Sequence, residues 1–187
     1  MTKTEARITY KKYRSVLSIN DIKIRSTAIA EQVQKMDIWH YEYYHIFMPI
    51  DHQKEVDTQF IFDILEKKNK KIIVSKSILE TAEMLHYVVD KNTKFQSNHY
   101  GIPEPINANP IETSIINVVF VPLLAYDSYG NRVGYGKGFY DKFLSKCQPN
   151  VVKIGLSFFE PECLISGFLN SDVKLDYCAG PTALTCF

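Results

Sequence analysis

The sequence predicts an α/β protein with a mainly parallel central sheet covered by helices. Short apolar runs alternate with stretches of helical periodicity, an order typical of parallel strands joined by helices. The run 118–121 is almost purely apolar, as expected of a central strand that is covered on both faces. With 187 residues and 45% hydrophobic composition the chain can build one core, so we expect a single domain over residues 1–187.

Two helices are expected at the N-terminal end. Residues 3–17 contain no glycine or proline and carry basic side chains beside a thin apolar stripe, which predicts a basic helix tied only weakly to a core. Ser18 to Asp21 forms a stop and N-cap signal. Beyond it, apolar residues recur at near-helical spacing and predict an amphipathic helix: Ile22, Ile29, Val33 and Met36.

Strands and helices then alternate up to residue 74. Residues 43–48 form an apolar and aromatic run ended by Pro49, which predicts a buried strand. Residues 55–67 return to helical periodicity, so Glu55 is expected to begin a helix, where its charge favours the helix dipole. Residues 71–74 predict the next strand.

The middle of the chain is less regular. Residues 84–89 and 93–96 predict two shorter strands, and an antiparallel pairing of the two is one arrangement that fits. The segment 101–110 contains three prolines and can be neither a helix nor a central strand. We therefore expect it to be a loop.

The C-terminal half returns to the regular pattern. After the strand at 118–121, a helix is expected to begin at Gly138 or Phe139 and to present one apolar face through Cys147. Residues 151–156 predict a further buried strand. Ligands of such sheets lie beyond the carboxyl ends of the strands, so we expect a site in the loop after residue 121.

Composition argues against several kinds of partner. Lys plus Arg total 22 against 21 for Asp plus Glu, so no overall field attracts the protein to nucleic acid or to an anionic membrane. No apolar stretch approaches the roughly 20 residues that span a bilayer. The four cysteines form no C-x-x-C pair and follow no secretory signal, and the five histidines form no zinc pattern, so none is assigned to catalysis. We expect a cytoplasmic monomer that acts on small molecules.

A glycine-rich loop carries the strongest functional signal. Three glycines stand at alternate positions just before a predicted helix: Gly134, Gly136 and Gly138. Their backbone N–H groups and the helix N-terminus can approach an anion closely. Lys137 and Arg132 add positive charge for phosphate oxygens, and Asp141 can hold magnesium against those oxygens.

Known glycine motifs do not fit this loop. A Walker loop needs glycine where Asn131 stands and Ser or Thr where Gly138 stands. A dinucleotide fingerprint needs glycine in place of Phe139 and a position early in a βαβ unit. The plain alternative is a tight turn with Lys137 in solvent, which leaves the charged residues on either side unexplained. We predict the phosphate-binding loop of a nucleotide-using enzyme.

The segment from Val121 to Asp141 resembles the signature of the 5-formyltetrahydrofolate cyclo-ligase family, also called methenyltetrahydrofolate synthetases. Other segments resemble parts of the family in the same order: Lys3 to Arg7, Arg14 to Ser18, Pro49 with Glu55 to Thr58, Tyr100 to Pro105, and Asp172 to Asp176. The resemblance thus covers nearly the whole chain. It implies a three-layer α/β/α fold with helices on both faces of the sheet.

The resemblance also implies an activity. Members close 5-formyltetrahydrofolate to 5,10-methenyltetrahydrofolate with ATP and Mg2+ and release ADP and phosphate. The formyl oxygen takes the γ-phosphoryl group, and N10 then attacks the activated carbon. Such chemistry asks for positioning and charge neutralisation rather than an enzyme nucleophile.

The same resemblance implies roles for individual residues. The catalytic set is Lys137, Arg132 and Tyr140. The ATP contacts are Lys3, Arg7, Arg132, Gly134, Tyr135, Gly136, Lys137, Gly138, Phe139 and Tyr140. The folate contacts are Pro49, Glu55, Tyr100 and Tyr140. The metal ligands are Asp141 and Asp176.

Plainer interpretations apply to some of these positions. A basic helix usually exposes its charges to solvent, and we keep that interpretation for Arg14. Lys3 and Arg7 are four residues apart and share one helical face, so the resemblance favours a joint contact with ATP. Tyr100 either anchors a loop or stacks on the folate ring.

Two other functions stay open. A different phosphate-handling enzyme, such as a relative of sugar-phosphate isomerases or coenzyme A transferases, would need its own base or glutamyl nucleophile. A non-catalytic folate or nucleotide binder would be expected to have lost Lys137 or Asp141, and both are present.

Overall fold

A computed structural model describes residues 1–98, 101–106 and 108–187, and its centre is an eight-stranded sheet. The strands in sheet order are β12 (Leu184–Cys186), β11 (Tyr177–Ala179), β10 (Val152–Leu156), β7 (Val118–Pro122), β1 (Tyr43–His45), β2 (Lys71–Ile78), β3 (Glu83–Val89) and β6 (Asn109–Ile111). The four pairs from β11 to β2 are parallel, and the outer pairs are antiparallel. The predicted α/β class with a mainly parallel sheet is confirmed.

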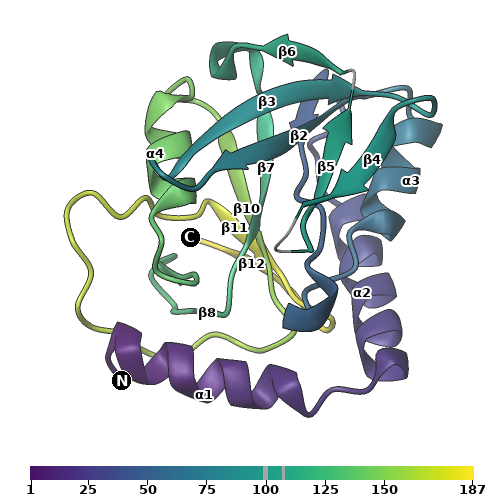
Figure 1. Ribbon diagram of the computed structural model, residues 1–187. Coiled ribbons are helices and arrows are strands. Elements are labelled where there is room, and N and C mark those ends of the chain that lie inside the picture. The colour runs from purple at the N-terminus through teal and green to yellow at the C-terminus, as the bar shows by residue number, and fades with distance from the viewer. Residues whose placement is uncertain (99–100, 107) are drawn as a thin grey trace.

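Helices cover the sheet on both faces, as Figure 1 shows. Helices α2 (Ile19–Gln34) and α3 (Gln59–Lys67) pack on one face and α4 (Phe139–Lys146) on the other. The strand β7 supplies both cores, because Val118 and Phe120 belong to the cluster with α2 and α3 while Val119 and Val121 belong to the cluster with α4. This alternation explains why residues 118–121 are uniformly apolar.

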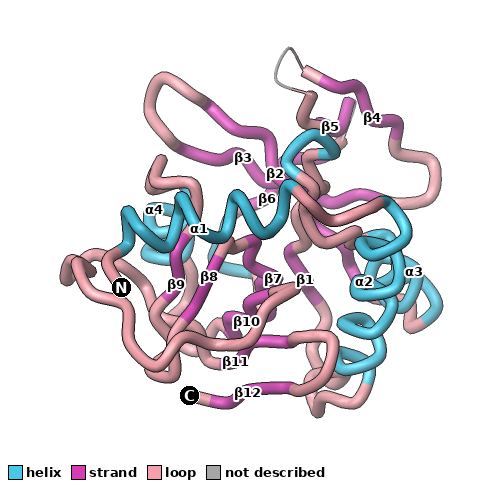
Figure 2. Tube along the Cα trace, turned by 90° about the horizontal axis from the view of Figure 1, so that it is seen from below, coloured by secondary structure: helices cyan, strands magenta, loops and turns pink. Residues whose placement is uncertain are grey.

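The first helix, α1 (Lys3–Ser15), lies outside these layers. It crosses a small antiparallel pair, β8 (Ala125–Tyr126) and β9 (Arg132–Val133), as seen from below in Figure 2. Ala6 and Tyr10 are buried there, and the Tyr10 hydroxyl donates to Glu162 Oε1 at 2.6 Å. The helix is therefore held more firmly than its thin apolar stripe predicts.

Two expectations about the third helix and its strand need correction. Helix α3 begins at Gln59, because the Thr58 hydroxyl donates to the Phe47 carbonyl and the Asp57 N–H donates to Ser26 Oγ, which holds the preceding residues in a loop. Glu55 lies in that loop, so its expected role at a helix N-terminus is wrong. The strand expected at 43–48 ends at His45, and the chain continues to the short 3-10 helix η1 (Asp51–Gln53).

The pairing of the middle strands also differs from the expectation. β3 pairs with β2 and β6, whereas β4 (Lys94–Ser97) pairs with β5 (Pro103–Ile106), so a direct pairing of residues 84–89 with 93–96 is wrong. The proline-rich segment is not only loop, because it contains β5 and β6. Both are edge strands, where a proline nitrogen that cannot donate costs little.

Three short elements complete the description of the fold. The 3-10 helix η2 (Thr113–Ile115) leads into β7, and β11 and β12 form the C-terminal edge of the sheet. Neither of these strands was expected from the sequence. In the described parts of the chain, no helix combines the length and apolar character needed to cross a membrane.

Gly155 in β10 has no room for a side chain. A Cβ built there would lie 2.6 Å from Leu123 Cδ2 and 2.7 Å from Leu175 Cδ1. We expect Gly155→Val to lower the free energy of unfolding by about 1–3 kcal/mol in urea titrations, because overpacking displaces neighbours. Gly180→Ala is the control, because a Cβ built at Gly180 would lie 3.5 Å from its nearest neighbour, the Ala183 carbonyl oxygen, which is an ordinary van der Waals distance. An unchanged urea midpoint for Gly155→Val would mean that the leucines move aside without cost.

Candidate active site

A cavity of about 510 Å³ lies beyond the carboxyl end of β7. The glycine-rich loop, α1, the segment around Glu55 and the hairpin of β2 and β3 enclose it. It is lined by most of the residues that the sequence singled out, namely Lys3, Arg7, Glu55, Arg132, Gly134, Tyr135, Gly136, Lys137, Gly138, Phe139, Tyr140 and Asp141. The fold thus brings residues from positions 3 to 141 to one site.

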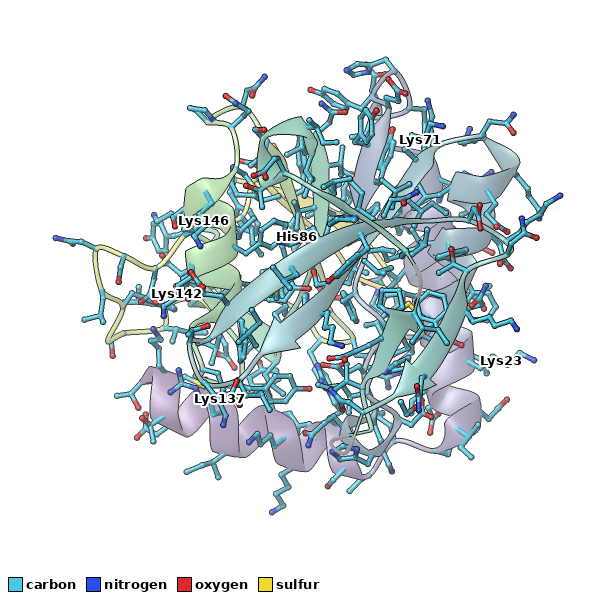
Figure 3. All side chains as sticks on the ribbon, turned by 45° about the horizontal axis from the view of Figure 1, so that its top comes forward. Lys23, Lys71, His86, Lys137, Lys142 and Lys146 are labelled. Atoms are coloured by element: carbon cyan, nitrogen blue, oxygen red, sulfur yellow. The ribbon has the colours of Figure 1, made fainter. Side chains whose placement is uncertain are left out.

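The glycine-rich loop adopts a backbone that requires glycine at two positions. Gly136 has φ 90° and Gly138 has φ 75°, both in the left-handed region. A Cβ at Gly136 would also lie 3.2 Å from the Arg7 guanidinium, so the loop approaches α1 closely. Gly138 caps α4, and Lys137 is exposed at the base of this helix beside α1, as Figure 3 shows. The loop therefore presents an exposed cation next to a helix N-terminus.

Arg132 is buried in the wall of the cavity with only 8% of its surface exposed. Its Nη2 donates to Asp141 Oδ1 at 2.8 Å, and the Val173 N–H donates to the same oxygen at 3.0 Å. Burial lowers the pKa of Arg132 and Asp141 raises it, but a guanidinium stays charged at physiological pH. Its buried Nη1 has no hydrogen-bond partner among the described residues. An anion in the cavity would supply one.

Helix α1 lines the cavity with its basic face. Arg7 Nε donates to the Gly134 carbonyl at 3.1 Å, and Lys3 Nζ lies 2.7 Å from Asp172 Oδ2. Asp172 also lines the cavity, and the sequence did not single it out as a site residue. Lys3 and Arg7 do come to one site, as their spacing of four predicts.

Glu55 also lines the cavity and is 5% exposed. One carboxylate oxygen accepts the Ile50 N–H and the other accepts the Tyr135 hydroxyl, both at 2.8 Å. Burial raises the pKa of Glu55, and these two hydrogen bonds oppose the rise. The carboxylate is therefore held in one orientation at the cavity surface.

Arg14 corrects the expectation of a solvated helix face. It is 4% exposed, and its Nη1 donates to the Tyr135 hydroxyl at 2.8 Å while Nη2 donates to the Leu123 carbonyl at 2.6 Å. A single basic residue on a basic helix carries no sequence signal that separates burial from exposure. Only the tertiary contact with Tyr135 reveals its role.

Tyr140 lines the cavity from the first turn of α4. Its ring contacts those of His45 and Phe143, with centroids 6.0 and 5.9 Å apart, and burial raises the pKa of its phenol. The charges of Glu55 and Arg132 also act on this phenol, the first raising and the second lowering its pKa. The Tyr140 phenol is therefore neutral at physiological pH and lies within electrostatic range of both Glu55 and Arg132.

Ser75 is a second cavity residue, after Asp172, that the sequence did not single out. The Ser75 hydroxyl lines the cavity and lies 2.5 Å from His45 Nε2 and 3.2 Å from His86 Nδ1. Burial lowers the pKa of His45 well below its usual value and that of His86 to about 4, so both rings are neutral near pH 7. His86 lies between the sheet and α4, as Figure 3 shows.

Two described residues of the predicted site, Asp176 and Pro49, do not line this cavity. Asp176 lies elsewhere, because its carboxylate accepts the Lys153 N–H at 2.7 Å and pairs with Lys153 Nζ at 2.8 Å. Its expected role as a metal ligand stays a prediction. Pro49 does not line the cavity, although its neighbours Met48 and Ile50 do. Tyr100 lies outside the described residues.

Comparisons with known proteins agree with this geometry. A sequence model of the 5-formyltetrahydrofolate cyclo-ligase family matches residues 1–162. The chain is 27% identical over 152 residues to a probable 5-formyltetrahydrofolate cyclo-ligase of Schizosaccharomyces pombe, and the alignment covers 74% of both chains. It is 31% identical over 110 residues to a 5-formyltetrahydrofolate cyclo-ligase of Haemophilus influenzae, covering 56% of this chain and 58% of the relative.

The fold has a solved counterpart. The NMR structure of Aquifex aeolicus 5,10-methenyltetrahydrofolate synthetase superposes with a TM-score of 0.82 at 25% identity, covering 100% of this chain and 93% of that one. The family match reaches from α1 through the glycine-rich loop to β10, which are the elements that build the cavity. The chain belongs to the 5-formyltetrahydrofolate cyclo-ligase family.

Proposed function

We propose that this protein converts 5-formyltetrahydrofolate to 5,10-methenyltetrahydrofolate with ATP and Mg2+, releasing ADP and phosphate. The observation that carries the proposal is a single cavity with a cationic glycine-rich loop at one end and a buried carboxylate at the other. The first end suits a polyphosphate and the second suits a ring with N–H donors. The family match supports the same assignment.

The triphosphate would bind along the glycine-rich loop. Lys3, Arg7 and Lys137 surround this end of the cavity, and Arg132 has a buried nitrogen free to bond a phosphate oxygen. Positive charge fixed in advance stabilises the charge that spreads over a transferring phosphoryl group. We assign Lys137 and Arg132 to this step, with the loop glycines, Tyr135 and Phe139 shaping the nucleotide site.

The chemical step needs no nucleophile from the protein. The formyl oxygen attacks the γ-phosphorus and ADP leaves, which turns the amide-like group into an iminium phosphate. N10 then attacks the formyl carbon, N10 loses its proton, and the C–O bond breaks to release phosphate. The protein contributes orientation of the two substrates and neutralisation of charge.

The folate would occupy the end of the cavity formed by Glu55. Its carboxylate can accept hydrogen bonds from the pterin ring, and Met48 and Ile50 provide apolar contact beside it. We assign the Tyr140 hydroxyl to the reacting formyl group, because Tyr140 lines the cavity and its phenol is influenced by the charges of both Glu55 and Arg132. Tyr100 remains a predicted folate contact.

Magnesium would be held by Asp141 together with phosphate oxygens and water. No group of three or more potential ligands occurs in the described part of the chain, so the protein alone does not form a complete metal cage. This fits an ion that binds through one carboxylate plus substrate phosphates. We further propose that the protein acts as a cytoplasmic monomer on these small molecules.

The test mixes purified protein with 5-formyltetrahydrofolate, ATP and Mg2+ and follows the methenyl product by its near-ultraviolet absorbance. We expect product and ADP in equal amounts, and no product when ATP or Mg2+ is omitted. ADP release without methenyl product would indicate a different phosphate-handling enzyme. Binding of both ligands without either product would indicate a non-catalytic member of the family.

A further inference from the structure

A chain of three polar side chains, with the partly buried Tyr135 between the buried Arg14 and Glu55, joins the glycine-rich loop to the segment around Glu55. Arg14 Nη1 donates to the Tyr135 hydroxyl, and this hydroxyl donates to Glu55 Oε1, each at 2.8 Å. Tyr135 belongs to the loop assigned to ATP, whereas Glu55 belongs to the end assigned to folate. The two ends of the cavity are therefore in direct contact through one phenol.

Helix α1 holds Tyr135 in place on more than one side. Lys11 Nζ lies 5.7 Å from the centroid of the Tyr135 ring, a cation–π distance, and Arg7 Nε donates to the carbonyl of the preceding Gly134. Arg14 is itself fixed by its second bond to the Leu123 carbonyl. The hydroxyl of Tyr135 is thus positioned by the backbone and by α1, independently of a nucleotide.

The direction of each hydrogen bond follows from the donors available. A guanidinium only donates and an ionised carboxylate only accepts, so the phenol accepts from Arg14 and gives its single proton to Glu55. The cation and the anion are both almost fully buried, and the phenol between them connects their charges. Buried charged groups need such partners, because an unpaired one costs far more than an exposed one.

From this arrangement we propose that Tyr135 is a positioning residue for folate: its hydroxyl, oriented by Arg14, holds the Glu55 carboxylate ionised and turned toward the ring of the folate. The inference rests on the proposed function of Glu55. Tyr135 thus belongs by sequence to the nucleotide loop and acts through its side chain on the other substrate. The side chain of Tyr135, in the glycine-rich loop, therefore helps to determine the affinity for folate.

The pKa of Glu55 provides a measurable test of the proposal. The groups that face this carboxylate are Arg14 from α1, His52 from η1, Tyr135 from the loop and Tyr140 from α4. Burial raises the pKa of Glu55, and the hydrogen bond from Tyr135 opposes that rise. Removing this hydroxyl therefore raises the pKa of Glu55 further, and the ionised form is lost at a higher pH than in the wild type.

The key variant is Tyr135→Phe, which keeps the ring above Lys11 and removes only the hydroxyl. We expect KM for 5-formyltetrahydrofolate to rise about tenfold or more, while KM for ATP changes less than about twofold, because a hydrogen bond to a charged group is lost. The acidic limb of kcat/KM for folate should move to higher pH. Tyr129→Phe, at an exposed tyrosine, is the matched control and should leave both parameters unchanged.

A second variant separates positioning from general damage to the loop. Glu55→Gln keeps an oxygen that can accept from Tyr135 and removes the charge. If the hydroxyl acts through Glu55, the effects of Tyr135→Phe and Glu55→Gln on folate KM are less than additive in the double variant. Full additivity, or a larger effect of Tyr135→Phe on ATP than on folate, would overturn the proposal.

A measurement without substrates keeps this test separate from the proposed function. The pKa of Glu55 is followed by carbon-13 NMR of its carboxyl group in the wild type and in Tyr135→Phe. A higher pKa in the variant supports the link even if the wild type makes no methenyl product, an outcome that would reject only the proposed activity. An unchanged Glu55 pKa would reject the link.

Discussion

Lys137→Ala is expected to lower kcat about 10²–10³-fold while changing KM for ATP far less. Lys137 is exposed at the rim of the cavity and forms no ion pair with the described residues, so its ammonium group is available for a phosphate that moves during the reaction. Charge that is needed most in the transition state affects turnover more than binding. The measurement is steady-state kinetics with both substrates, read as methenyl product.

The control for this variant is Lys142→Ala. Lys142 lies on α4, the helix that follows the glycine-rich loop, and donates to the Thr81 carbonyl at 2.6 Å, away from the cavity lining; Figure 3 shows both lysines. We expect this control to retain its kcat. Both variants should melt close to the wild type, because exposed lysines contribute little to stability. Weaker ATP binding with unchanged turnover in Lys137→Ala would contradict the assignment.

The parts of the fold that the sequence predicts are those governed by local patterns. Residues 118–121 are apolar at every position, and that alone identifies the buried central strand. Ser18 and Asp21 form the capping box that begins α2, so these two residues predict where the helix starts. In both cases the physical cause lies within a few residues of the signal.

Where the prediction failed, contacts distant in sequence decide the structure. Glu55 would favour the first turn of a helix, but hydrogen bonds to Ile50 and Tyr135 hold it in a loop. The proline-rich segment contains β5 and β6 because β4 and β3 lie beside them and leave the proline nitrogens at an edge. No periodicity within 101–110 carries that information.

The residues of the site likewise fall into those that a local motif predicts and those that only distant contacts bring together. Glycines with positive φ beside Lys137 are a local requirement and are readable as a motif. The burial of Arg14, the approach of Asp172 to Lys3 and the contact of Ser75 with two histidines all join residues far apart in the chain. The ion pair of Asp176 with Lys153 at 2.8 Å is another contact between distant residues that no local pattern indicates.

Arg132→Lys is the second variant for which we expect a large effect. A lysine keeps the positive charge but lacks the planar fork, so it can bond Asp141 or a phosphate oxygen but cannot reproduce both arginine contacts. We expect kcat/KM for ATP to fall about 10²-fold, as for the loss of a charge-stabilising donor. The free energy of unfolding should fall by only about 1 kcal/mol, since a charge still faces the carboxylate.

Asp141→Asn distinguishes the role of Arg132 in phosphate binding from its pairing with Asp141. If Asp141 holds magnesium, this variant raises the Mg2+ concentration needed for half-maximal rate, whereas Arg132→Lys leaves that concentration nearly unchanged and weakens ATP use. Both variants disturb the same 2.8 Å ion pair, so a purely structural pair would give them the same kinetic pattern and the same loss of stability. Matching Mg2+ and ATP profiles in the two variants would therefore show that Arg132 and Asp141 only support each other.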